Sequence, residues 1–222
     1  MKIIDIRADW LGNRPSQDMI LANIATAGRI CYQSEGKIPD AEFVRRLIKR
    51  GHESVLEHEK VSVVVLCDRG VSHEYVRHRV ASYSQESTRY CNYSQEKFDG
   101  GVTYIDISDG IDRCPVTSKL NHDTIAAILL EWVKACKDAE RHYLRMLDLG
   151  ASPQIARSVL NNSTKTQLAI TMNLREWRHF FSLRCDITAH PQMRELAELL
   201  LDMLHDAIPV IFDDLMEAQS DV

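Results

Sequence analysis

The stretch that decides the fold is Val61-Ser62-Val63-Val64-Val65-Leu66-Cys67. Four of its seven residues are β-branched valines, and apolar side chains occupy both faces, which is typical of a strand buried inside a sheet. Residues 164–172 alternate instead, with Thr166, Leu168, Ile170 and Met172 on one face. That period of two indicates a strand covered on one side. A third strand is predicted over residues 2–6, so the chain is expected to fold around a sheet.

Helical patterns surround these strands. They predict helices over residues 18–31, 41–50, 71–78, 121–149, 173–184 and 191–205. The second of these has Asp40 as its expected N-cap and Gly51 after its last turn. The longest closes at Gly150, and its apolar residues are spaced alternately four and three apart: Ile125, Leu129, Trp132, Cys136, Ala139, Tyr143 and Met146. Such a stripe packs against a neighbour, either within one subunit or between subunits. Residues 91–120 fit no regular element and are expected to form a long irregular connection.

Composition excludes several classes of protein. The 222 residues carry a net charge of −5 and are 45% hydrophobic, with no repeat or linker, so one domain over residues 1–222 is expected. An acidic surface disfavours general binding to nucleic acid or to membrane, and no apolar run is long enough to span a bilayer. The six cysteines form no Cys-x-x-Cys pair and are expected to be reduced thiols in the cytoplasm. The acidic segment after Arg194, which has no Lys or Arg, is interpreted as a solvated face.

Histidine and arginine concentrate in one part of this acidic chain: His52, His58, His73, Arg77, His78, Arg79 and Arg89. Two dipeptides, at residues 52–53 and 73–74, resemble the start of a His-Glu-x-x-His zinc motif. The position of the second histidine is occupied by Leu56 in one case and by Arg77 in the other, so no metal site is expected. An anion fits better, because arginine presents a rigid fork of donors that matches phosphate. If residues 71–78 are helical, Glu74 and Arg77 share one helix face.

Part of this cluster belongs to a longer motif, Arg77-His78-Arg79-Val80-Ala81-Ser82-Tyr83-Ser84-Gln85-Glu86-Ser87-Thr88-Arg89-Tyr90. It resembles the signature of the flavin-dependent thymidylate synthases, in which Arg-His-Arg is followed after seven residues by Ser. Residues 51–58 (GHESVLEH), 155–157 (IAR) and 173–180 (NLREWRHF) are similar to further segments of that family. The resemblance covers most of the chain and leaves out residues 91–120 and the C-terminal tail.

The resemblance implies an α+β fold, with a central, largely antiparallel sheet flanked by long helices in a single domain. It implies conversion of dUMP to dTMP, with the carbon taken from 5,10-methylenetetrahydrofolate and the hydride from reduced FAD that NADPH regenerates. It further implies a homotetramer whose subunits share active sites. No cysteine lies in a matching motif, so activation of uracil by electrostatic polarisation is expected in place of a thiolate.

The resemblance also assigns roles to residues. Those placed at dUMP are Glu74, Tyr75, Val76, Arg77, Gln85, Glu86, Ser87, Thr88, Arg89, Arg157 and Arg184. Those placed at FAD are Ser54, Arg77, His78, Arg79, Gln85, Asn173, Arg175 and His179, together with His52 and His190. Ser87 and Arg89 are expected near the phosphate, and Gln85 lacks the charge that a general base needs.

Arg184 is the expected catalytic residue. Within a helix it projects from the same apolar face as Trp177 and Phe181, where an unpaired charge costs several kcal/mol. A bound anionic pyrimidine would offset that cost, whereas a helix ending before residue 184 would let the side chain reach water.

Two alternatives stay open at this point. A related flavoenzyme acting at carbon 5 of another pyrimidine nucleotide would differ only in details of its pocket. A protein that binds nucleotides without catalysis would take no flavin.

Overall fold

The predicted central strand forms as β3 (Lys60–Asp68), in a computed structural model that describes residues 1–34, 36–98 and 100–220. Its sheet has the order β2–β3–β6–β4 and is antiparallel throughout, with β2 at Arg7–Trp10, β4 at Ala81–Gln85 and β6 at Lys165–Asn173. β3 pairs with β6 along its whole length, from Lys60 opposite Asn173 to Asp68 opposite Lys165. The prediction of a mixed fold around a largely antiparallel sheet is therefore confirmed.

A second, smaller sheet lies at the edge of the first. β1 (Lys2–Ile4) pairs in parallel with β5 (Thr103–Ile105). The prediction of one strand over residues 2–6 was half right, because the chain leaves β1 after Ile4 and begins β2 three residues later. Residues 91–120 contain β5, α4 (Ser108–Arg113) and two short 3₁₀ turns, η2 (Glu96–Phe98) and η3 (Thr117–Lys119).

All the predicted helices form, with shifted ends. They are α1 (Gln17–Tyr32), α2 (Asp40–Lys49), α3 (Arg69–Tyr75), α5 (His122–Asp148), α7 (Leu174–Arg184) and α8 (Pro191–Ala207). Asp40 is the first residue of α2 and not its N-cap, because Pro39 occupies that position. α3 ends three residues early, at Tyr75. Four further elements were not predicted: η1 (Glu53–His58), α6 (Pro153–Ala156), η4 (Arg157–Val159) and α9 (Pro209–Ser220). Among the described residues, no helix is long and apolar enough to cross a membrane.

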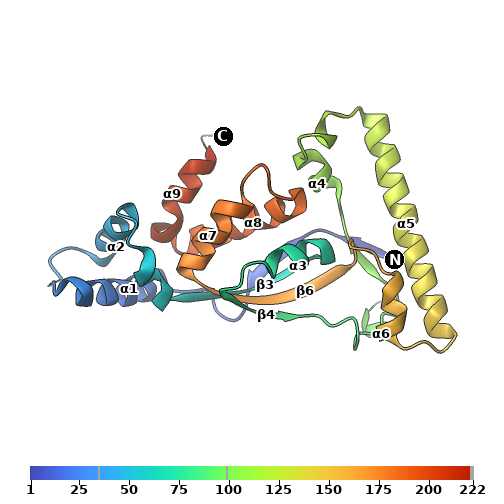
Figure 1. Cartoon of the computed structure of the whole chain (residues 1–222), viewed down its shortest axis with the longest axis horizontal. Coiled ribbons are helices and arrows are strands. Elements are labelled where there is room, and N and C mark those ends of the chain that lie inside the picture. Colours follow the sequence, from blue (N-terminus) through green and yellow to red (C-terminus); the bar gives the residue numbers. More distant parts are fainter. Residues whose placement is uncertain (35, 99, 221–222) are drawn as a thin grey trace.

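The helices cover one face of the main sheet. α3, α7, α8 and α9 lie on the same side of the strands, and α5 stands across their far end (Figure 1). Alternate side chains of β3 and β6 point into this layer, where Trp177, Phe180 and Phe181 of α7 are buried. The opposite face carries the exposed residues Ser82, Ser84 and Gln167. The sheet is thus a platform that positions α3 and α7 side by side.

The long helix α5 is only partly packed. The Asn121 side chain caps it by accepting a hydrogen bond from the Thr124 N–H. Of the predicted stripe, Cys136 and Tyr143 are buried in a small second core, where the Tyr104 hydroxyl donates to the Cys136 carbonyl. Towards the N-terminal end, Ile125 and Leu129 of the stripe are only half-buried. The stripe therefore packs within the subunit over only part of its length.

The acidic tail is not a purely solvated face, so that interpretation was wrong. Arg178 is buried and binds the carboxylates of Asp214 (2.7 Å) and Glu53 (3.1 Å). Burial alone would raise the pKa of Asp214, but the Arg178 guanidinium outweighs this and holds the pKa below its usual value. Arg178 thereby ties α9 to α7 and η1.

Candidate active site

The Arg-His-Arg string forms a tight turn between α3 and β4. The side chain of Asp68 caps α3 by accepting from the Val71 N–H. After Tyr75 the chain leaves the helix, and the Tyr83 hydroxyl lies 2.7 Å from the Tyr75 carbonyl oxygen and 2.9 Å from that of His78. Burial raises the pKa of Tyr83, so its hydroxyl keeps the proton that these two acceptors share. The Tyr75 carbonyl also accepts from the His78 N–H (2.9 Å), so a tight turn follows α3 and Tyr83 fastens this turn to β4.

Arg184 lies at the end of α7 and reaches across to α3. Its Nη1 donates to Glu74 Oε2 (2.8 Å), its Nη2 to the Glu74 carbonyl (3.3 Å) and its Nε to His78 Nε2 (3.0 Å). The helix includes residue 184, and the side chain is only 17% exposed. The expectation of an unpaired charge was wrong, because Glu74 balances it. Glu74, placed at dUMP by sequence, and the expected catalytic residue are thus brought into contact.

His78 is the centre of this network. It is 5% exposed, with Phe180 edge-on at 5.0 Å and Nδ1 lying 3.3 Å from Glu176 Oε1. Burial lowers the pKa of His78 and the Arg184 charge lowers it further, while Glu176 opposes both. The imidazole is therefore neutral at neutral pH, and its contact with Glu176 is a hydrogen bond and not an ion pair.

A cleft of about 580 Å³ opens beside this network, between α7, η1 and the start of β4. Its lining includes Asn173, Arg175 and His179, three residues that the sequence placed at FAD. Arg175 and His179, four residues apart on α7, face the same space. Three carboxylates, of Glu53, Glu57 and Glu176, line it as well, and Arg175 Nη1 lies 2.5 Å from Glu57.

A second cluster lies at the other end of α3. The Arg157 Nη1 donates to the hydroxyl of buried Thr88 (3.0 Å), and both line a cavity of about 430 Å³ together with Arg69. Arg69 Nη1 is buried and has no hydrogen-bond partner among the described residues. An arginine donor without an acceptor, beside a second arginine and a hydroxyl, is suited to an anion.

The remaining residues placed at dUMP have other contacts here. The Gln85 Nε2 donates to Ser72 and Thr166, and the Glu86 carboxylate accepts from Lys165 (2.5 Å) and Tyr93 (2.9 Å). Tyr75 is fully buried and stacks on Phe180. Val76 is exposed, Ser87 accepts from the Arg89 N–H, and Arg89 stacks over the Tyr90 ring.

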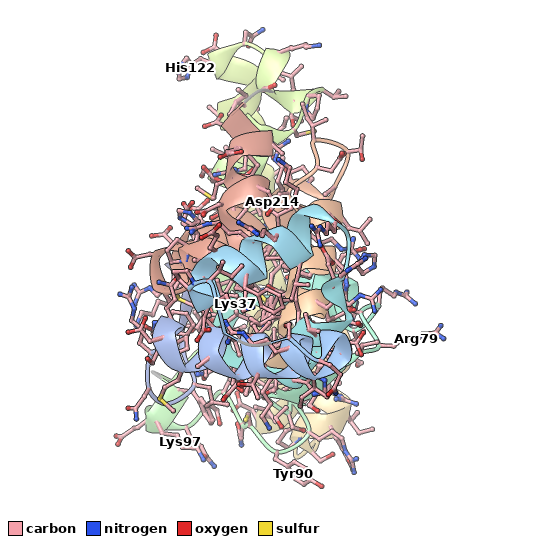
Figure 2. All side chains as sticks on the ribbon, turned by 90° about the vertical axis from the view of Figure 1, so that its left-hand side faces the viewer. Lys37, Arg79, Tyr90, Lys97, His122 and Asp214 are labelled. Carbon is pink, nitrogen blue, oxygen red and sulfur yellow. The ribbon has the colours of Figure 1, made fainter. Side chains whose placement is uncertain are left out.

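The other residues placed at FAD are dispersed. Arg77 and Arg79 are exposed, and Arg79 extends away from the body of the molecule (Figure 2). His52 and Ser54 lie at the exposed start of η1, next to the cleft. His190 precedes α8 near Asp68. Burial raises the pKa of the Asp68 carboxyl, and the hydrogen bond from the Val71 N–H partly opposes this. One chain therefore does not gather all of these residues in one place.

No cysteine is poised for nucleophilic attack in this region. Cys185 follows Arg184 in the chain, but burial and the charge of Glu198 raise the pKa of its thiol to about 12. A thiol with this pKa is almost wholly protonated at neutral pH. Among the described residues no cluster of His, Cys, Asp and Glu could hold a metal ion.

Sequence reasoning missed Arg69 and Glu176. Arg69 lies outside the matched segments, and Glu176 lies within residues 173–180 but was given no role. Arg69 is marked only by its place at the start of a helix that follows a buried strand. Glu176 is marked only by its place three residues after Asn173, where the Asn173 side chain caps α7 by accepting the Glu176 N–H.

Comparisons with known proteins identify the family and the fold. The family model described as "Thymidylate synthase complementing protein" matches residues 17–210. A flavin-dependent thymidylate synthase of Geobacter sulfurreducens is 34% identical over 203 residues, covering 87% of this chain and 81% of the relative. One from Mycobacterium tuberculosis is 34% identical over 202 residues, covering 87% and 78%. The crystal structure of the UMP/dUMP methylase PolB from Streptomyces cacaoi has a TM-score of 0.80 at 22% identity and covers 98% of this chain and 97% of its own. That likeness shows a shared fold.

Proposed function

The chain belongs to the family of flavin-dependent thymidylate synthases, and from this premise we propose that it methylates dUMP at carbon 5 to give dTMP. The one-carbon unit comes from 5,10-methylenetetrahydrofolate, and NADPH is the reductant that recharges the flavin. The observation that supports this proposal most is the contact of Arg184 with Glu74 and His78, since it brings together three residues to which the resemblance gives roles at dUMP, at FAD and in catalysis.

Arg184 is the residue that polarises uracil. A guanidinium has five N–H donors, and three are used by Glu74 and His78, which leaves two for a substrate. These unused donors can hydrogen-bond the edge of a pyrimidine that has lost its N3 proton, and the positive charge stabilises that anion. The deprotonated ring is electron-rich at carbon 5, so no thiolate is needed.

FAD is the flavin we propose for the cleft beside α7. Asn173, Arg175 and His179 present donors to a pyrophosphate or to a flavin ring, and the exposed Arg77 and Arg79 add charge at the rim of the turn. When bound, the reduced cofactor supplies the hydride of the reaction. Since Arg175 pairs with Glu57, binding requires Arg175 to exchange that partner for the cofactor.

The cluster of Thr88, Arg157 and Arg69 binds the phosphate of dUMP. We expect Arg157→Ala and Arg69→Met each to raise KM for dUMP about tenfold or more with kcat nearly kept, because a charge-assisted hydrogen bond to the phosphate contributes about 1.5–3 kcal/mol. Steady-state kinetics measure this. Arg141→Ala is the control, since Arg141 is exposed on α5 and pairs with Asp138. A loss confined to kcat in either test variant would contradict the assignment.

We propose a homotetramer with shared active sites. The partly exposed stripe of α5 offers an apolar surface for another subunit, and the two clusters at opposite ends of α3 allow different subunits to supply them. Arg184→Ala and Arg157→Ala chains, each inactive alone at low dUMP, should regain activity when co-expressed, because one mixed site then receives both arginines. If mixed oligomers form and stay inactive, the sites are not shared.

Turnover with different nucleotides tests the reaction. Supplied with FAD, NADPH and methylenetetrahydrofolate, the protein should methylate dUMP in preference to dCMP and UMP. Preference for another pyrimidine nucleotide would favour the related flavoenzyme, and binding without turnover would favour a nucleotide-binding protein.

The six cysteines are all free, and we propose a cytoplasmic location, where thiols stay reduced.

A further inference from the structure

Glu176 and Arg184 lie two turns apart on α7, and His78 from the turn after α3 bridges them. The Arg184 Nε lies 3.0 Å from His78 Nε2, and His78 Nδ1 lies 3.3 Å from Glu176 Oε1. All three side chains are largely withdrawn from water, with exposed fractions of 17%, 4% and 13% for Arg184, His78 and Glu176. Contacts made away from water fix orientation more strongly than exposed ones.

The direction of each hydrogen bond follows from chemistry. An arginine Nε always carries a proton, so His78 Nε2 must be the acceptor. A neutral imidazole with a bare Nε2 carries its proton on Nδ1, and that proton points at the Glu176 carboxylate. The opposite tautomer would turn an N–H of His78 towards the N–H of Arg184. The carboxylate therefore selects the tautomer that Arg184 requires.

We propose that Glu176 is a positioning residue for Arg184 and acts through His78. It holds His78 in the Nδ1–H tautomer, and His78 in turn fixes the guanidinium plane so that the two unused N–H donors keep one direction. This inference rests on the proposed function for its effect on turnover, whereas the tautomer itself does not depend on any ligand.

The charged and titratable surroundings of His78 are few. From α7 it faces Arg184, Glu176 and His179, whose ring centroid lies 6.0 Å away; from α3, Glu74 reaches it through Arg184; and from β4, Tyr83 contacts its carbonyl. Of these, Glu176 is the group that raises the pKa of His78. Protonation of His78 would place an N–H against Arg184 and break the contact.

The test compares Glu176→Gln with Glu176→Ala. The amide oxygen of Gln can accept the same Nδ1 proton, so kcat should stay within about threefold of wild type, whereas Ala should lower kcat about tenfold to a hundredfold. Removing the charge also removes the group that raises the pKa of His78, so the acidic limb of the kcat profile should move to lower pH in Glu176→Gln. A merely structural role would not move that limb.

Glu57→Gln is the matched control. It removes the same charge from the same cleft, but Glu57 pairs with Arg175 and does not contact His78, so the acidic limb should stay in place. Equal shifts in both variants would overturn the proposal, as would wild-type kcat in a folded Glu176→Ala variant.

A second measurement needs no turnover. Nitrogen NMR of histidine-labelled protein, with His78 identified by its loss in His78→Gln, should show Nδ1 protonated and Nε2 bare in the wild type. In Glu176→Ala the signals should show a mixture of tautomers. The reverse tautomer in the wild type would overturn the proposal even if dUMP is turned over, and the expected tautomer would stand even if it is not.

Discussion

Replacing Arg184 with alanine is expected to lower kcat for dUMP by about 10²–10³-fold, while the affinity for FAD should change by less than about threefold. The reason is that Arg184 acts on charge that develops in the pyrimidine, whereas the cofactor is held by the separate cleft of Asn173, Arg175 and His179. Rapid-mix or steady-state turnover gives the first quantity, and flavin fluorescence titration gives the second.

The loss should not come from unfolding. Removing Arg184 frees Glu74, whose side chain is 40% exposed and can be solvated, so the melting temperature should change little. Arg184→Lys keeps the positive charge but loses the planar set of donors, so its kcat should lie between those of the wild type and Arg184→Ala. Equal losses of turnover and FAD affinity would contradict the assignment, because they would place Arg184 in cofactor binding.

Trp177→Ala should lower the free energy of unfolding by about 3–5 kcal/mol. Trp177 is fully buried, it stacks on Phe181 at 5.7 Å and meets Phe180 edge-on, and its Nε1 donates to the Val61 carbonyl. Its removal leaves a cavity between α7 and β3, and one buried carbonyl loses its donor. Urea unfolding measures the change.

Two further variants serve as comparisons for the unfolding free energy of Trp177→Ala. Trp177→Phe keeps a ring and loses mainly the hydrogen bond, so a cost of about 1–3 kcal/mol is expected. Tyr90→Ala removes an aromatic side chain that is 78% exposed and projects outward (Figure 2), so its cost should stay below about 0.5 kcal/mol. A Trp177→Ala loss as small as that of Tyr90→Ala would mean that α7 does not pack on the sheet as described.

Sequence predicted the elements whose patterns are local. β3 and β6 have clear strand patterns, α5 has a capping Asn121 and a closing glycine, and α7 has its cap in Asn173. The Arg-His-Arg string and the helix of Arg184 are contiguous motifs, so their residues could be named before the structure.

The features that sequence did not predict depend on distant partners. The turn after α3 is fastened by the Tyr83 hydroxyl from β4. α9 is held through Asp214, and its partner Arg178 lies 36 residues earlier in the chain. The role of Glu176 can be inferred only once the fold places His78 in contact with it. Contacts of this kind leave no periodic trace in the sequence.

The measurement that tests the central claim most directly is the visible absorption spectrum of the protein with FAD during titration with dUMP. The claim is that a flavin and dUMP occupy one site, in which Arg184 and the cleft of α7 are neighbours. A bound-flavin spectrum that dUMP perturbs with saturation is the predicted result. Two results would contradict it. The protein could stay colourless after FAD is added and excess cofactor is removed, or the flavin spectrum could stay unchanged at saturating dUMP.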